Sequence, residues 1–170
     1  MAGSTTCAIA GGGPAGVLLG LLLARAGVQV TVLEKHRDFL RDFRGDTVHP
    51  TTQSLIDELG LSAEFDAIVR GRIAEVEMST RDAPVLRVKI AGAAPRAKFH
   101  DIALAPQWDL LDLLATEAGR YPGFDLRMGA ECIGVTRGPT GAVNGVRYRD
   151  DEGEHELSAV LTVAADGRSS

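Results

Sequence analysis

The sequence has few cysteines and histidines, and neither residue type is spaced as a metal site. Its 170 residues contain two cysteines, Cys7 and Cys132, which form no Cys-x-x-Cys pair. The four histidines show neither His-x-His nor His-x-x-x-His spacing. We therefore expect no metal site, and two cysteines that pack as small hydrophobic residues in a reducing compartment such as the cytoplasm.

Long hydrophobic runs and blocks of like charge are missing as well. The apolar block Val17–Ala24 has eight residues, whereas a membrane-spanning helix needs about 20. The first six residues carry no basic side chain, which a secretory signal would need. The 18 lysines and arginines are scattered and the net charge is −5, which argues against a nucleic-acid or anionic-membrane partner. These absences predict a soluble, cytoplasmic chain long enough for one domain.

Glycine, in contrast, is abundant and is concentrated near the start of the chain. Residues Gly11–Gly16 read GGGPAG, a G-x-G-x-x-G motif between an expected strand at 5–10 and an expected helix. A second expected strand, 28–33, ends at Glu34, roughly 20 residues after the first glycine. This order of strand, glycine loop, helix, strand and acid predicts a dinucleotide-binding unit.

The residues of this loop have distinct physical roles. Gly11 permits the tight turn out of the strand, Gly13 lets a pyrophosphate approach the backbone, and Gly16 lets the helix pack closely on the sheet. The helix start, which includes Pro14 and Ala15, supplies unpaired backbone N–H groups and the positive end of the helix dipole. We therefore expect the anion to bind at this point.

The acid at the end of the second strand bears on which dinucleotide binds. The carboxylate of Glu34 can accept hydrogen bonds from an adenosine ribose. It would repel a 2′-phosphate, so NADPH is disfavoured at this position. NAD and FAD both remain possible from the residues alone.

The remainder of the chain mixes helical and strand patterns. Alternation of polar and apolar residues in 74–80 and 85–90 predicts an antiparallel hairpin. We assign 73–105 as an antiparallel β insertion that begins a substrate layer over the cofactor. The other expected elements are helices over 50–60, 62–69 and 107–119, and strands at 102–105, 131–137, 142–149, 155–158 and 159–165. The last of these is continuously apolar and is expected to be a buried parallel strand.

Four features together resemble the FAD-dependent monooxygenases of the p-hydroxybenzoate hydroxylase type, the group A aromatic hydroxylases. GGGPAG with a strand ending in Glu34-Lys35 is similar to the family's FAD adenosine site. Arg44 is similar to its arginine segment beside the flavin, and Gln107 to the position whose side chain reaches the ribityl region. Asp166, in AADGRSS, matches the DG motif that contacts both FAD and the reduced pyridine nucleotide.

The resemblance implies an α/β fold, a Rossmann-type βαβ FAD-binding domain over 1–170 that is interrupted by antiparallel β structure. It implies that NAD(P)H reduces the FAD and that one atom of oxygen is then transferred to an aromatic or related small organic substrate. It identifies no catalytic side chain, because the flavin carries the chemistry. The family's later Gly-Asp motif would lie beyond Ser170, so we expect the amino-terminal portion of a longer enzyme. The sequence gives no indication of the oligomeric state.

Two other classes of function remain open. One is another FAD oxidoreductase on the same scaffold, such as a halogenase, a prenyl-chain reductase or a dehydrogenase. A disulfide reductase is disfavoured, because no redox-active cysteine pair follows the first helix. The other class is a non-catalytic dinucleotide-binding module.

Overall fold

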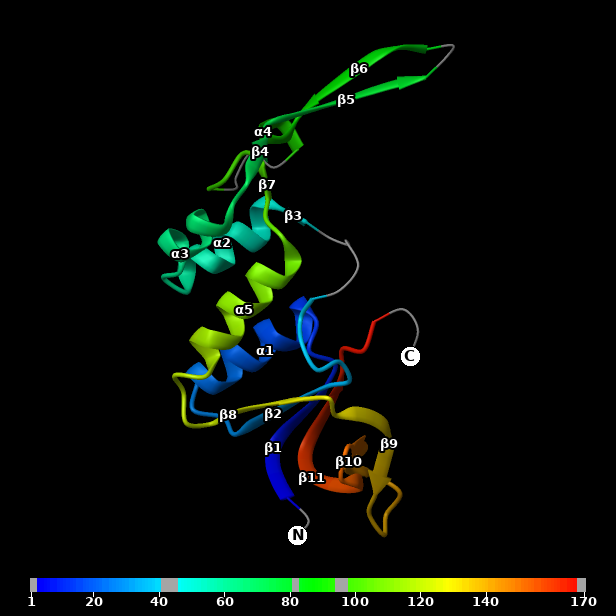
Figure 1. Cartoon of the computed structure of the whole chain (residues 1–170). Coiled ribbons are helices and arrows are strands. Elements are labelled where there is room, and N and C mark those ends of the chain that lie inside the picture. Colours follow the sequence, from blue (N-terminus) through cyan, green and yellow to red (C-terminus); the bar gives the residue numbers. More distant parts are fainter. Residues whose placement is uncertain (1–2, 41–45, 81–82, 94–97, 168–170) are drawn as a thin grey trace. The chain divides into compact units, whose positions relative to one another are not determined.

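The computed structural model describes residues 3–40, 46–80, 83–93 and 98–167 (Figure 1). The chain forms two compact units. The first combines Met1–Arg41 with Leu111–Ser170, and the second is Asp42–Leu110. The second unit therefore interrupts the first in sequence.

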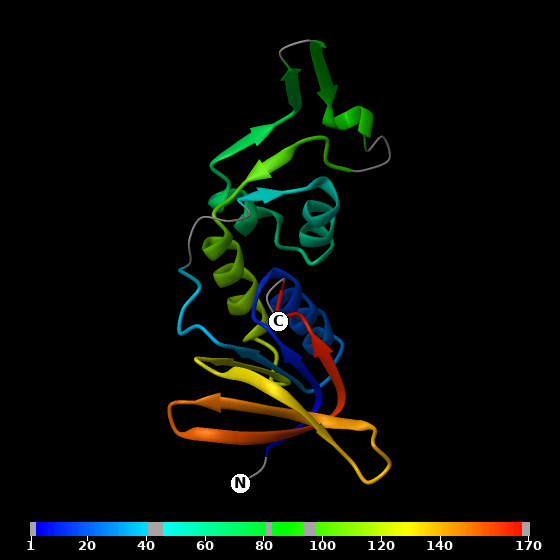
Figure 2. The same ribbon diagram turned by 90° about the vertical axis from the view of Figure 1, so that its right-hand side faces the viewer.

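The first unit is built on a six-stranded sheet with the strand order β8-β2-β1-β11-β10-β9. Four adjacent strands run parallel to one another: β8 (Phe124–Met128), β2 (Val30–Glu34), β1 (Gly3–Ala10) and β11 (Gly153–Ala164). The antiparallel strands β10 (Val143–Asp150) and β9 (Glu131–Arg137) extend the sheet beyond β11, as Figure 2 shows. Every residue of β2 is buried, as is typical of a parallel strand covered on both faces. The predicted mixed α/β fold is confirmed.

One face of the parallel strands is covered by α1 (Pro14–Arg25). A Cβ atom at Gly20 would lie 2.8 Å from the Phe124 ring and 2.9 Å from a Val32 methyl group, so the helix backbone approaches β8 and β2 closely. The helix ends before Gly27, whose φ of 82° suits glycine and whose N–H donates to the Ala24 carbonyl. The predicted strand-helix-strand unit is therefore present.

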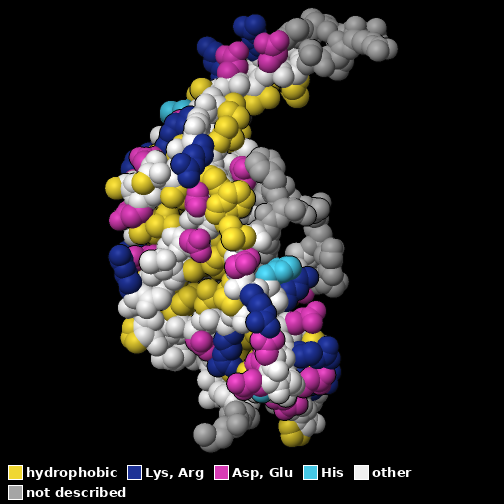
Figure 3. Space-filling model, in the orientation of Figure 1, with side chains coloured by type: hydrophobic (Ala, Val, Ile, Leu, Met, Phe, Trp, Pro, Cys, Tyr) yellow, Lys and Arg dark blue, Asp and Glu magenta, His cyan; other side chains and the backbone are white. Residues whose placement is uncertain are grey.

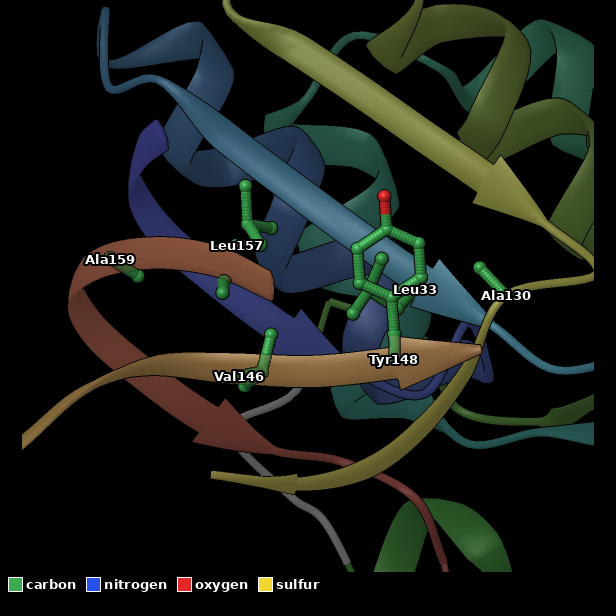
Figure 4. Packing of buried hydrophobic residues seen from close by; sticks show 7 residues of the cluster. Leu33, Ala130, Val146, Tyr148, Leu157 and Ala159 are labelled. Atoms are coloured by element: carbon green, nitrogen blue, oxygen red, sulfur yellow. The ribbon is translucent and has the colours of Figure 1, made fainter. Parts of the chain in front are cut away.

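The opposite face is covered by the antiparallel strands, which curl over it. Side chains from β1, β2, β10 and β11, together with Ala130, form one core cluster, which Figure 4 shows. Its members are Ala8, Leu33, Ala130, Val146, Tyr148, Leu157 and Ala159. The hydroxyl of Tyr148 on β10 accepts a hydrogen bond of 2.8 Å from Arg127 on β8. This bond joins strands that are far apart in the sheet order.

Two strand assignments differ from the sequence-based expectation. The strands expected at 155–158 and 159–165 are one strand, β11, which changes partner along its length: Gly153–Ser158 pairs with β10 and Leu157–Ala164 with β1. Its second half was expected to be buried, yet Val160 is 85% and Leu161 is 54% exposed. Strand β8 was not predicted, because FDLRM lacks the continuous apolar pattern of a buried strand. It lies at the sheet edge, where charged side chains reach water.

The described residues of the second unit include helices, a short helical turn and two small sheets. Its helices are α2 (Pro50–Glu58) and α3 (Ser62–Ile68), and α4 (Ile90–Ala93) is a single turn. One sheet has the order β3 (Thr47–Val48), β7 (Ile102–Leu104) and β4 (Gly71–Ile73), all antiparallel. The other is the predicted hairpin, β5 (Glu75–Thr80) with β6 (Ala83–Lys89).

The buried side-chain amide of Gln53 connects α2 to the three-stranded sheet of the second unit. The side chain of Gln53 on α2 is 1% exposed, and its Nε2 donates to the carbonyls of Val48 and Asp101. Its Oε1 accepts a hydrogen bond from Arg72 on β4. Because the amide is satisfied on both sides, it fixes α2 against the three-stranded sheet. The last helix, α5 (Gln107–Ala118), begins in this unit and continues into the first.

Candidate cofactor-binding site

A cleft of about 540 Å³ lies in the first unit, at the carboxyl ends of β1, β2 and β11. Open α/β sheets bind ligands at this end of their strands. The cleft is lined by Gly11, Gly13, Pro14, Ala15, Leu33, Glu34, Lys35, Glu131, Cys132, Ala165, Asp166 and Gly167. Seven of the residues singled out from the sequence are therefore brought together: Gly11, Gly13, Pro14, Ala15, Glu34, Lys35 and Asp166.

The three motif glycines differ in what surrounds them. At Gly11, φ is 106° and a Cβ atom would lie 2.4 Å from the Ala165 carbonyl oxygen, so the turn needs glycine both for its backbone and for space. At Gly16, a Cβ atom would lie 1.9 Å from the Gly11 carbonyl oxygen. At Gly13, nothing lies within 4 Å. The first and third glycines thus allow close packing, while the second leaves the start of the helix open.

The start of α1 has the features of an anion site. Pro14 is the first helical residue, and Gly13 is the N-cap with an extended backbone and no side-chain cap bond. The first intrahelical hydrogen bond in this turn runs from Val17 N–H to the Gly13 carbonyl, at 2.9 Å. The N–H groups of Ala15 and Gly16 come before it, and the first N–H groups of a helix lack intrahelical acceptors. Together with the helix dipole they favour a phosphate group here.

Glu34 lies at the end of β2 and is 3% exposed. Its Oε2 accepts a hydrogen bond of 2.8 Å from the N–H of Gly12, and its Oε1 accepts one of 2.9 Å from the N–H of His36. The side chain is therefore not a solvated acid at a strand end. It is a buried carboxylate held by main-chain donors at the edge of the cleft.

The turn that follows β11 closes the cleft beside the glycine loop. The N–H of Ala165 donates to the Ala10 carbonyl at 2.7 Å, and a Cβ atom at Gly11 would lie 2.9 Å from the Asp166 Cα. The main chain at Asp166 thus lies next to the first glycine of the motif, although 155 residues separate them in sequence. A cofactor contact from Asp166 remains a prediction that this position favours.

Sequence reasoning missed two residues of the cleft, Glu131 and Cys132 at the start of β9. The N–H of Ala130 donates to the Glu34 main-chain carbonyl at 2.8 Å, and this bond brings β9 to the end of β2. Cys132 was expected only to pack as a small hydrophobic residue. It is partly buried against the core cluster and also lines the cleft. No local motif marks these positions, because β9 reaches them through the curvature of the sheet.

Two other predicted contacts lie elsewhere. Arg44 falls outside the described residues. Gln107 is the first residue of α5 and belongs to the second unit, whereas the cleft belongs to the first. The flavin contacts expected of these two residues stay predictions.

Three further features of the described residues concern surface charge, helix length and possible metal ligands. On the face shown in Figure 3, basic and acidic side chains are interspersed. Ion pairs of the first unit include Arg37–Asp151 and Arg149–Glu154. None of the described helices is long and apolar enough to cross a membrane. Among the described residues, no group of three His, Cys, Asp or Glu side chains is arranged to hold a metal ion.

Comparison with known proteins gives one matching family model, described as the FAD binding domain, over residues 4–170. The chain is 31% identical over 168 residues to 6-methylpretetramide 4-monooxygenase of Streptomyces rimosus, covering 98% of the chain and 39% of that protein. It is 30% identical over 146 residues to a flavin-dependent monooxygenase of Mycobacteroides abscessus, covering 78% and 29%.

Solved structures show the same fold at low sequence identity. p-Nitrophenol 4-monooxygenase PnpA from Pseudomonas putida matches with a TM-score of 0.83 and 20% identity, over 100% of this chain and 42% of that one. The myxobacterial chondrochloren halogenase CndH matches with a TM-score of 0.85 and 23% identity, over 99% and 38%. The chain thus spans less than half the length of these relatives. By its sequence match over residues 4–170, the chain belongs to the FAD binding domain family.

Proposed function

We propose that this chain binds FAD as part of a flavin-dependent monooxygenase that acts on an aromatic or related small organic substrate with NAD(P)H as reductant. The observation that carries the proposal is the cleft itself. An open helix start and a buried carboxylate lie on the same cleft, and the family model identifies the domain as FAD-binding. When bound, FAD would supply the oxygen-transfer chemistry.

The described residues fit the ADP half of FAD. The pyrophosphate would lie at the start of α1, where Gly13 leaves open space. The ribose would follow at Glu34, whose carboxylate accepts hydroxyl hydrogen bonds. The adenine would then lie toward Glu131 and Cys132, which line the cleft beside Glu34. The residues of this chain bind and orient the cofactor.

The charges of the cleft support FAD over a 2′-phosphorylated nucleotide at this position. The lining includes three carboxylates, those of Glu34, Glu131 and Asp166, and one ammonium group, that of Lys35. An added 2′-phosphate would meet the Glu34 carboxylate directly. We therefore propose that NADPH does not compete with FAD for this cleft.

A halogenase is the second candidate. The chain is 28% identical over 166 residues to a 1H-pyrrole-2-carbonyl-[peptidyl-carrier protein] brominase of Pseudoalteromonas luteoviolacea, and CndH shares the fold. Three relatives with a monooxygenase name have higher identity than this brominase. The described cleft would serve either reaction, because it holds the part of FAD distant from the substrate.

Binding of FAD is tested by titrating the purified chain and following flavin fluorescence, with ADP and NADPH as competitors. We expect ADP to displace FAD and NADPH to do so far less well. Gly13→Val should abolish FAD binding with modest loss of stability, because its side chain would occupy the open space at the helix start. Parent-like FAD binding by this variant would exclude the phosphate site.

The reaction is tested by NADH and NADPH oxidation over a panel of phenolic substrates, with and without bromide or chloride. A hydroxylated product without halide supports the monooxygenase. A halogenated product that requires the halide supports the second candidate. FAD binding with neither product, measured on the longer enzyme of which this chain is proposed to be part, would favour a non-catalytic dinucleotide-binding module.

A further inference from the structure

Gly12 lies between the first two motif glycines, Gly11 and Gly13, at a position that the G-x-G-x-x-G pattern leaves open to any residue. Its backbone does not require glycine, since Gly12 is not among the glycines with positive φ. Its surroundings do. A Cβ atom at Gly12 would lie 2.7 Å from the Cβ of Glu34 and 3.1 Å from both the Cγ and the Oε2 of that side chain. Gly12 is therefore glycine for space, and the space is filled by Glu34.

Gly12 both packs closely against the Glu34 side chain and donates a hydrogen bond to it. The Gly12 N–H that approaches Glu34 donates to Oε2 at 2.8 Å, while the His36 N–H donates to Oε1 at 2.9 Å. One donor belongs to the glycine loop and the other to the chain just beyond β2. Both carboxylate oxygens are thus bound by main-chain groups, which cannot rotate away as side-chain donors can.

The main chain around this clamp is itself fixed. The Gly11 N–H donates to the Leu33 carbonyl at 2.8 Å, and the Gly129 N–H donates to the His36 carbonyl at 2.8 Å. The glycine loop, the end of β2 and the segment before β9 are therefore tied together by backbone bonds. The two main-chain donors that bind the Glu34 carboxylate, the N–H groups of Gly12 and His36, belong to these connected segments.

From these contacts we infer that Gly12 is a positioning residue for ribose recognition: it holds the Glu34 carboxylate in the orientation that reads the ribose hydroxyls of the adenosine. A carboxylate offers about four acceptor sites, so it can bind main-chain donors and ligand hydroxyls at the same time. Fixing the carboxylate in advance lowers the entropy lost on binding. The inference rests on the FAD binding proposed above and adds the determinant of its sugar specificity.

The test compares ADP with 2′-deoxy-ADP and 3′-deoxy-ADP, by calorimetric titration of the full chain. The parent should bind at least one deoxynucleotide roughly tenfold more weakly than ADP, because a missing hydroxyl leaves a charged acceptor unpaired. In Gly12→Ala, the added methyl group displaces Glu34, so this ratio should fall to about twofold or less.

Gly13→Ala is the matched control. It adds the same methyl group one residue later, where nothing lies within 4 Å. It can weaken all three nucleotides by crowding the pyrophosphate, but it should keep the parent's ratio between them. A purely structural effect of Gly12→Ala would weaken all three nucleotides equally. A Gly12→Ala ratio equal to the parent's would therefore overturn the inference.

A second measurement does not depend on the folding of Gly12→Ala. Hydrogen exchange of the Gly12 amide, followed by NMR, should be slow in the parent and clearly faster in Glu34→Gln, which lacks the charged acceptor. Equal exchange in the two proteins would show that Gly12 does not clamp Glu34. If the parent binds no ADP at all, the proposed function fails, while the exchange measurement still tests the clamp.

Discussion

Replacing Gly16 or Gly20 by alanine tests how closely α1 packs against its surroundings. Both residues lie within the helix, where glycine to alanine gains about 1 kcal/mol of helix propensity. The two positions differ in what the new Cβ atom meets. At Gly20 it meets the side chains of Phe124 and Val32 at 2.8 and 2.9 Å, whereas at Gly16 it meets the Gly11 carbonyl oxygen at 1.9 Å.

The difference in contact sets the expected difference in stability. Cβ atoms essentially never approach another atom below 3.0 Å, so Gly16→Ala must move the helix and the glycine turn apart by roughly 1 Å. The turn resists this movement because Gly11 is itself packed against Ala165. Overpacking costs about 1–3 kcal/mol, and a rigid backbone contact belongs at the upper end. After the propensity gain, we expect a net loss of about 2 kcal/mol for Gly16→Ala and about 0–1 kcal/mol for Gly20→Ala.

Thermal and urea unfolding measure this difference. For a chain of this size, 2 kcal/mol corresponds to a fall in Tm of about 4–8 °C. FAD affinity gives an independent readout, because Gly16→Ala displaces the start of α1 and Gly20→Ala does not. Equal Tm values for the two variants, or a Gly16→Ala variant as stable as the parent, would refute the close approach of α1 to the glycine turn.

Three further predictions concern single side chains. Glu34→Ala should weaken FAD binding by about 1–3 kcal/mol, because the ribose hydroxyls lose their acceptor; unchanged affinity would remove Glu34 from the site. Tyr148→Phe should lower the urea-unfolding free energy by about 1 kcal/mol through loss of the bond from Arg127, and no change would show that this bond is not stabilising. A hydrogen bond from Lys98 lowers the pKa of the Asp57 carboxyl. The resulting stabilisation is present above about pH 4 and lost on further acidification, so Lys98→Ala should flatten this acid limb of the unfolding curve.

The sequence predicted the strand-helix-strand unit well, because its determinants are local. The turn at Gly11, the helix start at Pro14 and the stop at Gly27 depend on the conformational preferences of glycine and proline. The apolar run of β2 reports burial on both faces. Each of these signals acts over a few residues, so it can be read without knowing what lies across the sheet.

Other features depend on which segments meet in space. Strand β8 exists because its backbone pairs with β2, and its own side chains give little sign of this. Strand β11 was read as two strands because its side-chain pattern changes where its partner changes from β10 to β1. Pairing between distant segments is set by register and sheet curvature, and a single local window contains neither.

In the candidate site too, some features follow from the local sequence and others from the packing of distant segments. The sequence by itself determined the glycine loop, the acid of Glu34 and the open helix start, because short-range backbone geometry requires those residue types at that spacing. Only the tertiary structure decided that Asp166 lies beside Gly11, that Glu131 and Cys132 line the cleft, and that Gly12 is glycine to make room for a side chain 22 residues away. These placements follow from close packing between distant segments, where the space available at one residue is set by the side chain of another.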